Sequence, residues 1–300
     1  MSYLVADKRY IAGNAASAVL GTSIEDYPEG IIIPIDKPYR WTSADVIRKV
    51  KYAACRHFGK KKLKVGHAGT LDPLATGVLL VCIGPATRQA ETLQKHDKEY
   101  LAGITFGATT PSYDLEKEID KKYPYDQVNE ERVREALKSF IGPQEQIAPL
   151  FSAKSIDGVR AYELARKLYR KSVSEGNDFD HSEAEILSRQ NIIIHEAELV
   201  SYNQMGITRP ETVTDDNPKN NRIHVCDYSD LHLPHADIRI ACTKGTYIRA
   251  FARDLGEALD TGAHLDALCR TRTGDFSVEN ALQIDEALAI LEFHKTINTD

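Results

Sequence analysis

The sequence has no apolar run long enough to cross a bilayer. Its longest uncharged apolar stretches, such as residues 77–85, fall far short of the roughly 20 residues that a membrane helix requires. The first 20 residues contain Asp7, Lys8 and Arg9 ahead of an alanine-rich stretch without a sustained apolar core, so we expect no signal peptide. The five cysteines are scattered and never spaced C-x-x-C. They indicate reduced thiols in a cytoplasmic protein, and imply neither a disulfide framework nor a zinc site.

The sequence also lacks a nucleotide-binding glycine loop and a motif with metal-ligand spacing. Its 300 residues, of which 42% are hydrophobic and 27% charged, are typical of a globular protein with one or two domains. Two polar, turn-rich stretches, 176–181 and 208–221, are expected to be exposed loops. We expect residues 1–26 to form an N-terminal extension and 27–300 a single domain with a polar insertion near 203–231.

Charge is distributed unevenly along the chain. The net charge is −6, which argues against a nucleic-acid partner. However, residues 37–67 contain ten Lys and Arg against Asp45 alone, whereas 171–235 contain twelve Asp and Glu against five Lys and Arg. A basic surface of this kind can follow a phosphate backbone, although a solvated lysine-rich loop is the simpler alternative.

Hydrophobic periodicity predicts a mixed α+β fold. Apolar or alternating runs predict strands, and amphipathic stretches with capping residues predict helices. The expected strands are 31–35, 78–83, 100–106, 191–200 and 236–242, and the expected helices are 42–56, a segment capped by Asn129 and ended by Gly142 and Pro143, 246–259 and 284–293.

The densest chemical signal is residues 66–77, GHAGTLDPLATG, which lead into the apolar run 78–83. Three glycines allow tight turns and close approach of a ligand. Pro73 disfavours helical geometry at Asp72, so its carboxylate is presented from an extended loop. An isolated Asp-Pro is usually only a turn. Beside His67 and the basic segment, however, Asp72 is a candidate nucleophile or base.

A second cluster, CTKGTYIR at 242–249, places Arg249 near the start of a predicted helix. An arginine there can hold a carboxylate ionised and oriented through a bidentate pair. The alternative is a surface arginine with Asp254 as a local partner.

With these motifs in place, the chain resembles the TruB-type tRNA pseudouridine synthases, whose relatives include the dyskerin-like enzymes. The resemblance covers roughly residues 31–276 in ordered blocks that include GHAGTLDPLATGVLLVCIGPATR, KEYLAGITFGATT, CTKGTYIRAFARDLG and GAHLDALCRTRTGDF. It implies the pseudouridine synthase fold, a mixed and mostly antiparallel sheet flanked by helices with the active-site cleft across it. Only 24 residues follow the last block, so we expect no C-terminal PUA domain.

The resemblance also implies roles for individual residues. Asp72 matches the essential aspartate, Tyr100 the tyrosine that stacks on the target base, and Arg249 the arginine that pairs with the aspartate. The implied substrate-binding residues are His67, Lys37, Gly66, Thr70, Tyr247 and Leu268.

The implied reaction is isomerisation of the T-loop uridine at tRNA position 55. Asp72 would act at C1′, either as nucleophile or as base in a glycal-type route. Nothing is oxidised or activated, so we expect no cofactor and no metal. We expect a monomer that binds the T-stem-loop of tRNA without guide RNA. The alternatives are a guide-RNA-dependent dyskerin-like synthase and a non-catalytic tRNA-folding protein. A glycosidase would need a second catalytic carboxylate, and the sequence offers none in a comparable loop.

Several positions depart from the family pattern, and Ala148, in place of a usual proline before Pro149, is one of them. Arg40 stands where the family usually has glycine, so the local turn there is in question. Lys154 follows Ser152 and Ala153 directly, where the family commonly has one residue between Ala and Lys, and no role is predicted for it.

Overall fold

The computed structural model describes residues 3–14, 18–149, 151, 155–156, 159–175, 189–206 and 223–291. The chain divides into two compact units, one formed by Met1–Lys98 with Cys269–Asp300 and the other by Glu99–Leu268. Strand β13 (Ala263–Thr273) continues through the second boundary. No helix among the described residues is long and apolar enough to cross a membrane.

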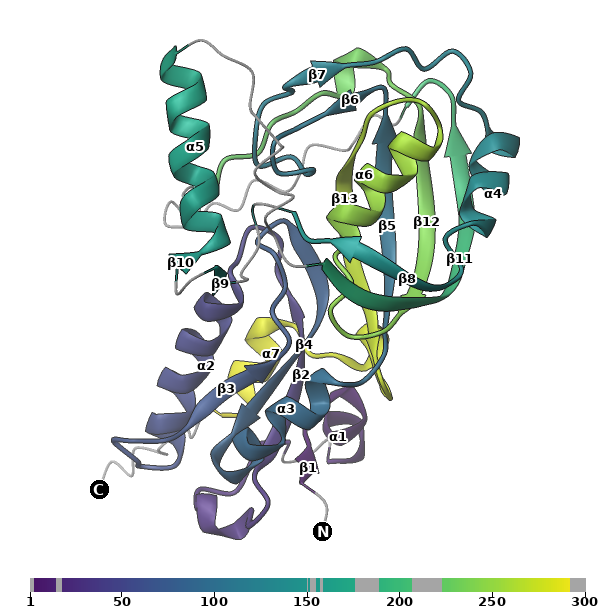
Figure 1. The fold of residues 1–300 in the computed structure, drawn as a ribbon. Coiled ribbons are helices and arrows are strands. Elements are labelled where there is room, and N and C mark those ends of the chain that lie inside the picture. Colours follow the sequence, from purple (N-terminus) through teal and green to yellow (C-terminus); the bar gives the residue numbers. More distant parts are fainter. Residues whose placement is uncertain are drawn as a thin grey trace. The chain divides into compact units, whose positions relative to one another are not determined.

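The first unit is built on β2 and β4, which pair antiparallel from Ile31 opposite Ile83 to Lys37 opposite Gly77. β1 pairs parallel with the outer side of β2, and β3 pairs antiparallel with β4. Figure 1 shows α2 and α3 beside β3, which they contact. The elements are β1 (Leu4–Val5), α1 (Lys8–Gly13), β2 (Ile31–Lys37), α2 (Ser43–His57), β3 (Val65–Ala68), β4 (Ala75–Ile83), α3 (Ala90–Gln94), β14 (Phe276–Ser277) and α7 (Ile284–Ala289).

Burial explains the apolar runs of this unit. Ile31, Ile32, Ile33 and Ile35 of β2 are fully buried, as is the whole run 78–83 of β4. A strand covered on both faces is expected to be continuously apolar rather than alternating. Helix α2 begins with a capping box, in which Thr42 and Asp45 satisfy each other's backbone N–H groups.

The second unit contains the strand order β5-β12-β11-β8, and β11 is antiparallel to both of its neighbours. Helix α4 contacts β11, and the ring of Phe251 on α6 packs edge-on against Phe140, 5.0 Å between centroids. The elements are β5 (Lys98–Phe106), β6 (Ala108–Thr109), β7 (Lys121–Lys122), α4 (Glu130–Lys138), β8 (Gly142–Ile147), β9 (Ser155–Ile156), β10 (Val159–Arg160), α5 (Ala161–Glu175), β11 (Arg189–Asn203), β12 (His235–Cys242), α6 (Ile248–Ala258) and the start of β13.

The predicted fold class is confirmed: the sheet is mixed, mostly antiparallel and flanked by helices. The five expected strands correspond to β2, β4, β5, β11 and β12, and the helices expected at 42–56 and 246–259 to α2 and α6. Asn129 caps α4 as predicted, but the helix ends at Lys138, and Gly142 and Pro143 begin β8 instead of ending the helix. Strand β13 and helix α5 were not predicted.

Several predictions concern residues outside the described part of the chain. Both expected loops, 176–181 and 208–221, lie there, as do Lys154, the central part of the 203–231 insertion and the last residues of the helix expected at 284–293. The beginning of that helix is present as α7.

Candidate active site

Asp72 lies in the turn that leads from β3 into β4. The Ala75 N–H donates to the Asp72 carbonyl at 3.1 Å, and the Asp72 side chain is half-buried. Gly77 follows with φ +98°, and a Cβ there would lie 2.2 Å from the carbonyl oxygen of Arg270. Only glycine combines this conformation with such a close approach. The motif glycine at 77 is therefore a packing requirement of the loop that carries Asp72.

Buried side chains fasten this loop on the side of β2 and α2. The Ser43 hydroxyl donates to the Leu71 carbonyl at 3.1 Å and accepts from the Leu71 N–H at 3.0 Å. The Lys37 ammonium donates to the carbonyls of Pro38, Trp41 and Pro73, at 2.9, 2.6 and 3.2 Å. Residues on both sides of Asp72 are thus held by the protein interior.

Arg270 fastens the same loop from β13. Its guanidinium donates to the carbonyls of Val78 (2.8 Å), Gly69 (3.1 Å) and Thr70 (3.5 Å), and its side chain is only 1% exposed. A planar, permanently charged guanidinium that donates to three carbonyls holds this part of the loop rigidly. Arg270 was not among the predicted site residues.

The charge of Lys37 is set by its surroundings. Burial lowers the pKa of Lys37 to about 7, although the carboxylates of Asp72 and Asp36 raise it. Three carbonyl acceptors use all three protons of the ammonium form. Lys37 therefore carries a positive charge near Asp72 when it is protonated, and its predicted role in substrate binding stays a prediction.

His67, Gly66 and Thr70 occupy the approach to Asp72. His67 lies on β3 opposite Val81, and burial, with a smaller contribution from the charge of Arg270, lowers the pKa of His67 and so favours the neutral ring. Gly66 has open space where a Cβ would lie, and Thr70 is exposed. The three residues are partly or fully exposed, whereas Ala68 and Leu71, which lie between them and Asp72, are buried.

A basic surface runs along α2 and the chain that follows it in the same unit. Arg48 pairs with Asp45 and Lys60 with Glu25, and Lys49 lies over the Trp41 ring. Positive groups interleaved with aromatic rings are typical of single-stranded nucleic-acid contacts. The exposed members of this basic surface are Arg48, Lys49, Lys51, Arg56, Lys61, Lys62 and Lys64, with Tyr52 among them.

Arg249 is fixed inside the second unit. It is 5% exposed, and its guanidinium donates to the carbonyls of Ser112 (3.1 Å) and Phe151 (2.8 Å). Its Nε lies 3.7 Å from the carboxylate of Asp114. Asp254 pairs with Arg253 instead. The alternative interpretation of Arg249 as a surface residue is therefore wrong.

Tyr247 caps the helix that carries Arg249. The buried Gln146 amide accepts from the Tyr247 N–H at 2.8 Å and donates to the Tyr247 carbonyl at 3.1 Å. This pair of bonds sets where α6 begins, and with it the direction of Arg249. Tyr100 is buried on β5, and Leu268 is half-buried on β13.

Arg40 adopts φ +62°, the left-handed conformation that favours glycine. Its N–H donates to the Pro73 carbonyl at 3.0 Å. The turn therefore keeps a glycine-type backbone although the residue is arginine, and this resolves the question that the sequence raised.

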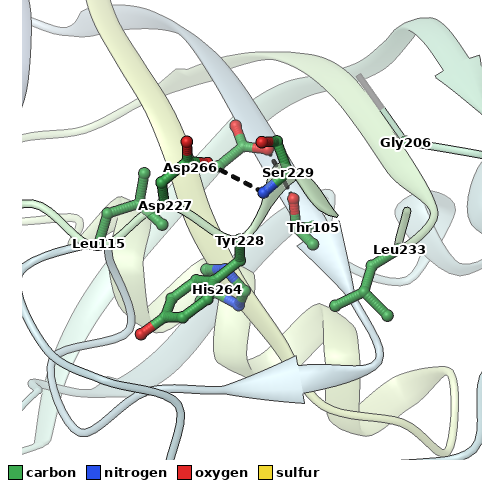
Figure 2. Close-up of a pocket in the computed structure, with 9 residues that line it drawn as sticks. All are labelled: Thr105, Leu115, Gly206, Asp227, Tyr228, Ser229, Leu233, His264 and Asp266. Carbon is green, nitrogen blue, oxygen red and sulfur yellow. Dashed lines mark hydrogen bonds between the residues drawn. The ribbon is translucent and has the colours of Figure 1, made fainter. Parts of the chain in front are cut away.

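A small cavity in the second unit contains none of the predicted site residues. Its volume is about 40 Å³, enough for a few water molecules but not for a base. Figure 2 shows the lining residues Thr105, Leu115, Gly206, Asp227, Tyr228, Ser229, Leu233, His264 and Asp266.

Sequence reasoning did not single out Ser43, Arg270, Asp114 or Gln146. Each acts by hydrogen bonding or pairing with groups distant in sequence, and a single sequence does not show such pairings. The available signals are weak: Ser43 stands near the start of the helix predicted at 42–56, and Arg270 lies in the block GAHLDALCRTRTGDF without a predicted role.

The chain matches two family models. Residues 56–208 match the TruB family pseudouridylate synthase N-terminal domain, and residues 249–299 match the tRNA pseudouridylate synthase B C-terminal domain. The protein is 46% identical over 276 residues to the tRNA pseudouridine synthase B of Phocaeicola vulgatus, covering 91% of this chain and 99% of that protein. It is 42% identical to the enzyme of the same name from Flavobacterium johnsoniae over 261 residues, 87% of this chain and 95% of that protein.

Solved structures agree in fold. A chain of a Cbf5–Nop10–Gar1 complex matches with a TM-score of 0.55 at 22% identity, covering 89% of this chain and 56% of that one. An H/ACA ribonucleoprotein bound to a substrate RNA containing 2′-deoxyuridine matches with a TM-score of 0.52 at 21% identity, covering 87% of this chain and 53% of that one. This chain thus spans about half the length of those proteins. By its family matches and its curated relatives, the chain belongs to the TruB family of pseudouridylate synthases.

Proposed function

We propose that this protein is a tRNA pseudouridine synthase that converts the T-loop uridine at position 55 to pseudouridine. The relatives that it matches over most of its length are named tRNA pseudouridine synthase B. The observation that carries the proposal lies within the first unit. The loop of Asp72 is braced by Lys37, Ser43 and Arg270, in the same compact unit as the exposed basic surface of α2.

The proposed reaction exchanges one bond of the sugar for another. The N1–C1′ bond breaks, the uracil rotates, and a C5–C1′ bond forms, while C5 loses its proton and N1 gains one. Positive charge develops at C1′ when the base departs, and a fixed carboxylate stabilises it. Asp72 supplies this carboxylate. The atoms balance without an oxidant or a transferred group, so the reaction needs no cofactor.

Tyr100 and Arg249 are proposed as the other catalytic residues, Tyr100 by stacking on the detached base and Arg249 by its charge. His67, Lys37, Gly66, Thr70, Tyr247 and Leu268 are proposed to bind or shape the substrate site. The reacting uridine must leave its stack to reach a carboxylate, and this costs a few kcal/mol, least in an already unpaired loop. The T-stem-loop is therefore the proposed recognition element, bound by a monomer without guide RNA.

The test is pseudouridine mapping on an unmodified tRNA transcript with purified wild-type protein and the Asp72→Asn variant. The amide keeps the shape of the side chain and removes its charge, so we expect tRNA binding without product. Asp285→Asn, an exposed aspartate of the same unit, is the matched control and should retain activity. A transcript with cytidine at position 55 should give no product.

Each alternative predicts a different result. A guide-dependent synthase would leave the transcript unmodified until an RNA and protein partners were added. A non-catalytic tRNA-folding protein would bind tRNA equally well in both variants and form no pseudouridine in either. Turnover by a clean Asp72→Asn preparation at a substantial fraction of the wild-type rate would refute the assignment of Asp72.

A further inference from the structure

Three metal-ligating side chains meet in the second unit, outside the candidate active site. Glu118, His224 and Cys226 each present one ligand atom, and these atoms lie within 4.8 Å of one another. Glu118 is more than a hundred residues from the other two, so the sequence spacing does not reveal the cluster.

The two segments that carry these residues are tied together by their backbones and by a tyrosine. The Cys226 N–H donates to the Leu115 carbonyl at 2.8 Å, which holds the 223–228 segment beside the 115–119 segment. The Tyr228 hydroxyl donates to Glu118 Oε2 at 2.9 Å and accepts from the Ile119 N–H at 2.9 Å. Figure 2 shows this hydroxyl turned away from the cavity of Ser229 and Leu233. Glu118 is therefore oriented before any ligand arrives.

One distance suits a tetrahedral metal centre, and Cys226 is close enough to Glu118 to share a hydrogen bond with it. His224 Nε2 lies 3.6 Å from Glu118 Oε1, too far for a hydrogen bond. Ligand atoms placed tetrahedrally at about 2.0–2.3 Å from a zinc ion lie roughly 3.3–3.8 Å from each other. Glu118 Oε1 thus stands at ligand-to-ligand distance from the imidazole, while the other oxygen, Oε2, is held by Tyr228.

We propose that Glu118, His224 and Cys226 bind one zinc ion, with water as the fourth ligand. A thiolate, an imidazole and a carboxylate form a mixed set that suits Zn²⁺ and disfavours the oxygen-seeking Ca²⁺ and Mg²⁺. The Tyr228 hydroxyl orients the carboxylate ligand, as outer-shell partners of metal sites do.

The position of the site indicates what the metal does. The 112–119 segment that carries Glu118 also carries Asp114, whose carboxylate lies beside the Arg249 guanidinium. Ser112 and the Glu116 N–H both donate to Asp114 Oδ1, at 2.6 and 2.9 Å. A zinc ion that joins this segment to residues 224–226 therefore steadies the surroundings of Arg249 without taking part in the isomerisation.

The test begins with the full-length protein, freed of metal with a chelator and titrated with Zn²⁺ against a chromogenic competitor. We expect one tight equivalent. Cys226→Ser, His224→Gln and Glu118→Gln should each weaken binding by more than about a hundredfold, because even loss of an outer-shell partner costs about 10–100-fold. Tyr228→Phe, which removes only the outer-shell partner, should weaken Zn²⁺ binding by about 10–100-fold. Cys55→Ser and His195→Gln, which alter a cysteine and a histidine elsewhere, should bind Zn²⁺ like wild type.

Two measurements independent of activity complete the test. Co²⁺ in place of Zn²⁺ should give a thiolate-to-metal charge-transfer band that Cys226→Ser abolishes and Cys55→Ser keeps. Zn²⁺ should raise the melting temperature of wild type and leave that of His224→Gln, which lacks one ligand, unchanged. Because His224 is exposed, its loss does not disturb the core and the variant should fold. Equal Zn²⁺ affinity in wild type and Cys226→Ser, or no tight equivalent in wild type, would overturn the proposal.

Discussion

Ser43 and Leu71 exchange two hydrogen bonds through one hydroxyl group, 28 residues apart in the chain. The hydroxyl donates to the Leu71 carbonyl and accepts from the Leu71 N–H, and both residues are buried. Ser43 is the first residue of α2, whose start is fixed by the Thr42–Asp45 capping box. The capped helix end thereby positions the backbone directly before Asp72.

Replacing Ser43 by alanine should separate positioning from binding. The change leaves the buried Leu71 N–H without its partner, which costs about 1–3 kcal/mol of unfolding free energy. A small displacement of Asp72 should lower kcat roughly ten- to a hundredfold while the Kd for tRNA stays unchanged. Ser139→Ala, at an exposed serine next to α4, is the matched control and should affect neither. If Ser43→Ala loses stability but keeps full kcat, the hydroxyl has only a structural role.

The contribution of Arg249 to kcat should depend on the planar shape of its guanidinium as well as on its charge. Arg249→Lys keeps the charge, but an ammonium lacks the fork that serves the Ser112 and Phe151 carbonyls together, so we expect a strong loss of kcat with tRNA binding retained. Asp114→Asn should lower kcat in the same direction, because it removes the carboxylate beside the guanidinium. Arg253→Lys, one turn further along α6, is the control. Equal losses in kcat and in tRNA affinity would instead identify Arg249 as a phosphate contact.

The left-handed residue Arg40 offers a test of stability. Arg40→Gly removes a conformational cost of about 1–2 kcal/mol, partly offset by the greater freedom of glycine in the unfolded chain. We expect a net gain of up to about 1 kcal/mol in unfolding free energy from urea denaturation. Arg40→Ala, which keeps the strain and loses the side chain, should show no gain. A glycine variant less stable than wild type would mean that the arginine side chain stabilises the fold by more than its backbone strain costs.

The fold could be predicted where the signal is local. The apolar run of β4 and the Thr42 cap of α2 are complete in a few residues, and both were found. Strand β13 was missed because polar residues fill several of its buried positions. His264 is buried with its Nδ1 at 2.9 Å from the Ala108 carbonyl, and Arg270 is buried on carbonyls of the Asp72 loop. Their partners lie more than 150 residues away, so periodicity does not show that these positions are interior.

The site was predictable to a similar degree. Asp72 was identified by the glycines and proline around it and by the family pattern, and these are properties of adjacent residues. The residues that support Asp72 and Arg249 were not identified. Ser43 and Arg270 bond to backbone groups, and Asp114 pairs with a charged side chain, and all these partners are distant in sequence. Sequence motifs therefore indicate candidate reacting residues, and the folded chain indicates which residues hold them.

His235 should make stability depend on pH. Burial favours the neutral ring, but hydrogen bonds and attraction from Asp266 (2.7 Å) and Asp237 (3.2 Å) outweigh it and raise the pKa of His235. A pKa raised on folding means that the native state binds the proton more tightly. The stabilisation is therefore complete below the unfolded-state pKa of about 6.5 and is lost as the pH rises through the higher native-state pKa.

The measurement is urea unfolding of wild type and His235→Gln across the neutral and mildly alkaline range. We expect wild-type stability to decline with rising pH and the variant to decline less. His232→Gln, an exposed histidine nearby, serves as control and should follow wild type. If the unfolding free energies of wild type and His235→Gln change in parallel with pH, a group other than His235 causes the pH dependence.

Substrate size tests where tRNA recognition resides. The exposed basic residues of 48–64 belong to the unit that carries Asp72, so phosphate contacts close to the reacting loop should dominate binding. An isolated T-stem-loop hairpin should then have nearly the kcat/KM of intact tRNA, and affinity for both should fall steeply with salt. Replacing Lys61 and Lys62 by alanine should weaken both substrates equally and reduce the salt slope by up to about 2, whereas Lys171→Ala should change neither. If the hairpin is nearly inert while tRNA reacts well, contacts beyond the T-arm carry recognition, and residues outside this basic surface must supply them.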